Sequence, residues 1–66
     1  MIPIEYSAIV LKYSHLGEPV CSRLTAIART MAVMRGRLRI ARKRAGANAE
    51  LARCKAMWLE LTGETV

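Results

Sequence analysis

Aromatic residues are scarce in this chain. It has no phenylalanine, one tryptophan and two tyrosines among 66 residues, although 53% of its residues are hydrophobic. The apolar content is therefore mostly alanine, leucine, isoleucine, methionine and valine, a set that suits packing between helices better than packing across a sheet. We expect an all-α fold in a single domain that covers residues 1–66.

Cysteines and long apolar runs are also few. Cys21 and Cys54 are too few for a disulfide framework or a metal site, so we expect buried free thiols in a reducing cytoplasm. The longest run without a charged residue covers 6–11, far short of the ~20 residues that a membrane span needs. Residues 1–5 lack the features of a secretory signal. We therefore expect a cytoplasmic protein with no membrane span.

Catalytic constellations are missing as well. His15 is the only histidine, and no acid stands at a spacing that would orient it as a base for a neighbouring serine. Neither a glycine-rich phosphate loop nor a metal-ligand spacing occurs. We therefore expect no enzymatic activity, no metal and no cofactor, with His15 either solvated or capping a helix.

One apolar pattern organises the middle of the chain. Its members are separated by alternating gaps of four and three residues, which is the a/d pattern of a long helix that presents a narrow seam to a partner. They are Val20, Leu24, Ile27, Met31, Met34, Leu38, Ala41 and Ala45. Gly36 costs ~1 kcal/mol inside a helix, but the pattern continues past it. We predict one helix over residues 19–45 that ends at Gly46.

A shorter helix is predicted on each side. The first covers about 3–16, starts at Pro3 and buries apolar residues at helical spacing before Gly17 ends it and Pro19 begins the next helix. Its stripe is Ile2, Tyr6, Ile9, Tyr13 and Leu16, with Val10 beside it. A strand is the alternative here, but the period of two fails over 9–11.

The third predicted helix covers about 49–62. Asn48 can cap it, and Glu50 falls in its first turn, where the helix dipole favours an acid. Its stripe is Leu51, Cys54, Trp58 and Leu61, and extending that stripe backwards adds Ala47. Gly63 should stop the helix, which leaves 63–66 as a frayed tail.

Together these lengths predict a short, a long and a short helix. The two short helices can lie end to end along the long one, both antiparallel to it, as a hairpin-type bundle in which Cys21 and Cys54 are too far apart for a disulfide. Tyr6, Met31 and Trp58 would then be covered on one side only, so we expect homo-oligomerisation, most simply a homodimer, to complete the core. The predicted oligomer and core seam is Val20, Leu24, Ile27, Met31, Met34, Leu38, Trp58 and Leu61.

The strongest functional signal is a basic segment. The chain has 11 lysines and arginines against five acids, a net charge of +6 and a pI near 10.2, a balance typical of proteins that bind nucleic acid, anionic membranes or acidic proteins. The predicted anion-binding residues are Arg35, Arg37, Arg39, Arg42, Lys43 and Arg44. Guanidinium groups match phosphate oxygens two at a time. The alternatives are a merely solvated face, or pairing with Glu50, Glu60 and Glu64 across an interface.

Part of this region resembles a known family. The segment 37–46 followed by 49–53 resembles the opening two helices of the repressor-type helix-turn-helix domains of phage and bacteria. That family continues with a turn and a helix that reads the major groove. Here residues 54–62 continue the helical pattern without a turn, so the resemblance gives no base-reading residue to carry over.

The sequence therefore indicates a class of function but no specific one. We expect a dimeric helical protein that binds nucleic acid through the basic segment, as a phage or plasmid accessory factor would. One alternative is an adaptor or inhibitor that binds an acidic surface of a partner protein. Another is an oligomer that sequesters a small anionic ligand such as a nucleotide.

Overall fold

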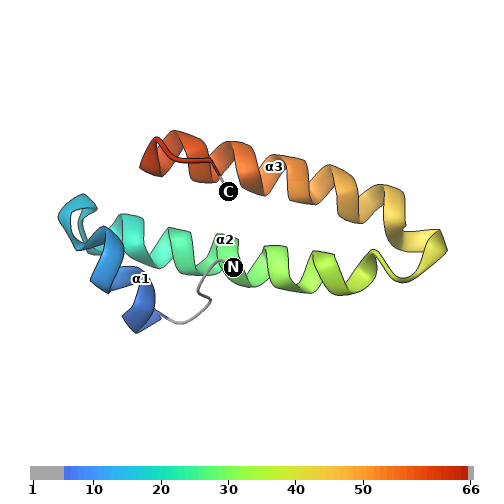
Figure 1. Ribbon diagram of the computed structural model, residues 1–66, viewed down its shortest axis with the longest axis horizontal. Coiled ribbons are helices and arrows are strands. Elements are labelled where there is room, and N and C mark those ends of the chain that lie inside the picture. The colour runs from blue at the N-terminus through green and yellow to red at the C-terminus, as the bar shows by residue number, and fades with distance from the viewer. Residues whose placement is uncertain (1–5, 66) are drawn as a thin grey trace.

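The computed structural model describes residues 6–65 and shows three α-helices that pack against each other. Helix α1 covers Tyr6–Tyr13, a 3₁₀ turn η1 covers Ser14–Leu16, and α2 covers Glu18–Arg37. A second 3₁₀ turn, η2, covers Ala41–Lys43 and leads into α3, Arg44–Thr62. Helices α2 and α3 lie side by side and run in opposite directions, and α1 packs against α2 near its N-terminal end (Figure 1). The all-α prediction is confirmed for the described residues.

The predicted boundaries of the second and third helices are wrong. Helix α2 ends at Arg37 instead of continuing to residue 45, and α3 begins at Arg44, so that Gly46 and Asn48 lie inside a helix. The three helices have 8, 20 and 19 residues, which is a short, a long and a long helix. The chain reverses direction upstream of the predicted turn, between Leu38 and Lys43.

Charge and tertiary packing together account for this break. A continuous helix would place Arg35 beside Arg39, and Arg39 beside Lys43, as like-charged pairs four residues apart, which destabilise a helix. Gly36 weakens the same stretch because glycine is a poor helix former. Ile40 instead takes an extended conformation, with φ −104° and ψ 111°. Reversal at this point lets α3 run along most of α2.

The connection between α1 and α2 uses Gly17 and Pro19 as predicted, but α1 ends at Tyr13 and not at Leu16, and the 3₁₀ turn η1 covers the last three residues of the predicted helix. Gly17 has a φ of +95°, a backbone conformation that side chains other than glycine rarely adopt. Its carbonyl accepts a hydrogen bond from the Cys21 N–H at 3.1 Å, and Pro19 lies in the first turn of α2. The predicted start of the first helix at Pro3, and Ile2 of its stripe, lie outside the described residues.

The core closes within one chain. Ile9, Leu24 and Met31 are 0% exposed, and Trp58 is 3% exposed. The expectation that Met31 and Trp58 would need a second copy to cover them is therefore wrong. Helix α3 is almost as long as α2 and covers the face that two short helices would have left open. Tyr6, the third residue that was expected to need a second copy, is 39% exposed.

The buried face of α2 is wider than the predicted seam. Leu24, Ile27 and Met31 are buried as the a/d pattern predicts, but so are the neighbouring Cys21, Thr25 and Ala28. A narrow seam fits one partner helix. Helix α2 contacts both α1 and α3, so its buried stripe covers two adjoining faces.

The C-terminal end of α3 is also the predicted one. Gly63 is left-handed, with φ 73°, and its N–H donates to the Leu59 carbonyl at 2.7 Å. This is the geometry by which glycine ends helices. Within residues 6–65, no helix combines the length and the apolar character needed to cross a lipid bilayer.

Candidate nucleic-acid interface

The turn between α2 and α3 is the centre of the candidate site. Three backbone hydrogen bonds continue past the end of α2, from Leu38 N to Met34 O at 3.1 Å, from Arg39 N to Gly36 O at 3.4 Å and from Ile40 N to Arg37 O at 3.0 Å. The last carbonyls of α2 therefore have partners within the turn. Lys43 N then donates to Ile40 O at 3.0 Å and closes η2. This bonding gives the basic segment a defined backbone.

Arg44 has a structural role in this turn. Its Nε donates to the Leu38 carbonyl at 3.0 Å and so links the first residue of α3 to the residue that follows α2. This bond holds the two ends of the turn together across six positions of sequence. One of the six predicted anion-binding residues therefore has a hydrogen-bond partner inside the protein.

The six basic residues gather at one end of the molecule. Arg35 and Arg37 lie in the last turn of α2, Arg39 follows it, and Arg42 and Lys43 lie in η2. With Arg44, all six are exposed. They were predicted on one continuous helix; the structure instead distributes them over two helix ends and the turn between them. This arrangement brings together cations that a straight helix would have spread along its length.

Within residues 6–65 none of these six cations has a carboxylate partner. The ion pair found there joins Arg53 Nη2 to Glu50 Oε2 at 2.7 Å, and both residues lie on α3. Glu60 lies in the last part of α3, and Glu64 follows it, at the end of the helix opposite the turn (Figure 1). Pairing of the basic segment with Glu50, Glu60 or Glu64 therefore does not occur within the chain. No carboxylate among residues 6–65 reduces the positive potential at the turn by pairing with one of the six cations.

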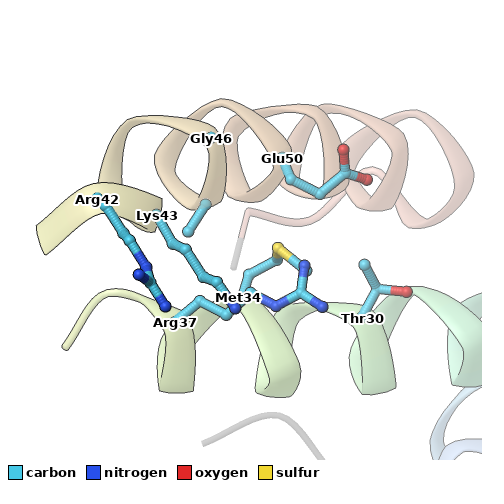
Figure 2. A pocket seen from close by; sticks show the side chains of 8 residues that line it. Thr30, Met34, Arg37, Arg42, Lys43, Gly46 and Glu50 are labelled. Atoms are coloured by element: carbon cyan, nitrogen blue, oxygen red, sulfur yellow. The ribbon is translucent and has the colours of Figure 1, made fainter. Parts of the chain in front are cut away.

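A groove of about 470 Å³ opens beside the turn, between α2 and α3. Arg42 and Lys43 line the end next to the turn, and Figure 2 shows them extending from the η2 side toward α2. The Arg37 side chain extends along the groove, so that its guanidinium lies beside Met34. Met34, Gly46 and Ala47 supply its apolar lining; Thr30 and Glu50 line it further along the helices. The groove thus combines a cationic end with an apolar floor.

The start of α3 also contributes to the field at this groove. No side chain caps the helix, and its first turn contains no acid. Helix N-termini carry partial positive charge from their unpaired N–H groups. That charge adds to the charge of the neighbouring side chains.

The predicted seam residues lie in the core or against it. Leu24, Ile27, Met31 and Trp58 are buried. The other four, which are partly buried and packed against the same core, are Val20, Met34, Leu38 and Leu61. Ala41 and Ala45, at the end of the predicted pattern, are exposed because α2 has already ended.

Both cysteines are buried free thiols, as predicted. The Cys21 Sγ donates a hydrogen bond to the Tyr13 carbonyl at 3.2 Å and so links α2 to α1. Burial raises the pKa of the Cys54 thiol, Glu50 raises it further, and Arg53 opposes the shift. A raised pKa keeps the thiol protonated and unreactive at neutral pH. The residues 6–65 contain no group of three or more potential metal ligands, and His15 is exposed.

Two features of the site have no clear signal in the sequence. Gly46 was interpreted as the end of a helix, whereas it lies in the first turn of α3 and lines the groove. Met34 was assigned to the seam, and its second role as part of the groove floor depends on where α3 begins. Knowledge of the turn's position would have been needed to find either one.

No protein-family model, curated protein or solved structure matches this chain. The partial resemblance to helix-turn-helix repressors is not borne out by the structure, because the chain turns over 38–43 and α3 then continues from Arg44 to Thr62 with no turn at Gly46. The functional argument therefore depends on the geometry of the basic turn.

Proposed function

We propose that this protein is a small, non-enzymatic, cytoplasmic nucleic-acid-binding protein that contacts the phosphate backbone through the turn between α2 and α3. The observation that carries the proposal is the gathering of six exposed cations at one end of the molecule without a carboxylate partner among residues 6–65. Phosphate backbones bind such clusters by releasing counterions, a term that does not depend on sequence.

The position of the cations can be separated from net charge by a matched pair of variants. The test variant carries Arg37→Gln, Arg39→Gln and Arg42→Gln, all at the basic turn. The control carries Arg23→Gln, Arg29→Gln and Lys55→Gln, which removes the same charge from exposed sites on α2 and α3 outside the turn. Both variants keep the Arg44 bond to Leu38 and should remain helical by circular dichroism.

Binding to a labelled oligonucleotide is measured by fluorescence anisotropy over a range of salt concentrations. We expect the test variant to lose affinity at least tenfold at low salt and to show a slope of log K against log salt that is smaller by about two to three, because each lost phosphate contact removes ~0.7–0.9 from it. The control should lose much less. Equal losses in the two variants would show that net charge alone is responsible, and no binding by the wild type at low salt would overturn the proposal.

The protein-adaptor alternative predicts a different result. An adaptor that binds an acidic surface of another protein would co-purify with that protein after nuclease treatment, and it would not bind oligonucleotides. The same cations would then have a different target. No contact in the structure favours this alternative over phosphate binding.

A homodimer remains part of the proposal, although Met31 and Trp58 are already buried within one chain. Two copies would present two basic turns to one nucleic acid, and linked contacts raise the overall affinity without new chemistry. Native mass measurement of the same samples, with and without nuclease, would show a particle of twice 7.3 kDa if the copies pair. A monomer at all concentrations would remove this part of the proposal alone.

A further inference from the structure

The groove beside the turn has the dimensions of a ligand site. Its volume of about 470 Å³ lies within the ~300–1,000 Å³ typical of pockets for small molecules. It is open along one side, so one unit of a polymer can enter it as well as a free small molecule. Three of the six cations of the basic turn, Arg37, Arg42 and Lys43, also line this groove.

The two ends of the groove match the two halves of a nucleotide. Arg42 and Lys43 form the end that suits a phosphate. The apolar stretch formed by Met34, Gly46 and Ala47 suits the face of a base, because a thioether makes favourable contacts with aromatic rings. A guanidinium plane can also stack on a base. A single anion such as sulfate would leave the apolar part of the groove unused.

The one acid in the groove lining is directed elsewhere. Glu50 lines the groove, but its carboxylate pairs with Arg53 at 2.7 Å. In Figure 2 the carboxylate lies beyond Met34 from Arg42 and Lys43 and points away from them. Its charge is therefore compensated by Arg53, and it lies away from Arg42 and Lys43 at the other end.

Gly46 keeps the groove open. A Cβ built at this position would meet nothing within 4 Å, so no packing contact requires a glycine here. The residue nevertheless lies in a helix, where glycine is unfavourable relative to alanine. A larger side chain at position 46 would occupy the groove without displacing the core.

We propose that this groove binds one nucleotide unit of a single-stranded nucleic acid, with the phosphate on Arg42 and Lys43 and the base against Met34 and Gly46. The inference rests on the proposed function and narrows it to single strands. A stacked base in a duplex reaches such a groove only after unstacking, which costs a few kcal/mol. A base in a single strand enters at much lower cost.

Two glycine variants provide the test. Gly46→Leu fills the groove, and Gly36→Leu is the matched control, since position 36 is also helical, exposed and free of neighbours within 4 Å but does not line the groove. Neither variant changes the charge. Circular dichroism and thermal unfolding should show both folded, because leucine is a better helix former than glycine.

Anisotropy titrations use a labelled single strand and a duplex with the same number of phosphates. We expect the wild type to bind the single strand more tightly than the duplex. Gly46→Leu should weaken single-strand binding about tenfold, the low end of what base contacts contribute, and leave duplex binding within about twofold. Gly36→Leu should change neither.

Three results would each overturn the inference and leave backbone binding intact. The first is equal affinity of the wild type for the single strand and the duplex, and the second is unchanged single-strand binding by Gly46→Leu. The third is an equal loss of single-strand affinity in Gly46→Leu and Gly36→Leu. Absence of binding to either nucleic acid by the wild type would instead overturn the proposed function, and the groove proposal with it.

Discussion

At the scale of single residues, membership of a basic cluster does not define a role. Arg42 and Arg44 lie two positions apart, and both are exposed. Arg44 donates to the Leu38 carbonyl at 3.0 Å, whereas Arg42 lines the groove. The first bond connects the end of α2 to the start of α3, so its loss acts on the fold before it acts on any partner.

Replacement of these two arginines should therefore separate stability from binding. Arg44→Ala should lower the free energy of unfolding by about 1 kcal/mol, the typical net value of one intramolecular hydrogen bond. Arg42→Ala should stay within about 0.5 kcal/mol of the wild type, as surface substitutions usually do. Urea denaturation followed by circular dichroism measures both. Equal stability of the two variants would show that the Arg44 bond contributes nothing in solution.

At the scale of elements, the four glycines show where the predicted helix ends were right and where they were wrong. Gly17 and Gly63 have positive φ and end helices, as predicted. Gly36 and Gly46 lie inside helices near the two ends of the turn, and nothing packs against either position. A glycine marks the end of a helix when its φ is positive, and the value of φ cannot be read from the sequence.

Alanine at either helical glycine should stabilise the protein. Gly36→Ala and Gly46→Ala should each raise the free energy of unfolding by roughly 0.5–1 kcal/mol, because alanine loses less backbone entropy in a helix and neither Cβ meets a neighbour within 4 Å. Thermal denaturation should show a higher midpoint for both. A lower midpoint for Gly46→Ala alone would indicate that the start of α3 needs glycine for a reason the helix does not reveal.

The break after Arg37 could not be predicted from apolar spacing, because Leu38 keeps the a/d phase and packs against the core after the helix has ended. The stripes of α3 were predicted correctly, since Ala47, Leu51, Cys54 and Trp58 are all buried. Spacing therefore identified most of the core, although it missed Cys21, Thr25 and Ala28 on the second buried face of α2. It did not identify where the chain turns, because like-charge repulsion and the burial gained by α3 decide that position.

At the scale of the whole molecule, an aromatic pair joins the first and last helices. The rings of Tyr13 and Trp58 meet edge to face, with centroids 5.7 Å apart and planes at 85°. Tyr13 is 4% exposed and Trp58 3%. Sequence analysis placed both residues on apolar stripes but expected a second copy to cover Trp58. Apolar spacing shows which face of a helix is buried, but it does not show that α1 and α3 contact each other.

Loss of this junction should unfold the chain. Trp58→Ala removes a buried aromatic ring at a typical cost of ~3–5 kcal/mol, close to the entire stability that a core of this size supplies. Tyr13→Phe is the matched control: it retains the ring that meets Trp58 and removes only the hydroxyl, so it should cost at most about 1 kcal/mol, the typical net value of one hydrogen bond. Calorimetry at two protein concentrations tenfold apart gives both values. Because the core closes within one chain, the loss should be the same at both; a loss that grew on dilution would show that a second copy completes the core.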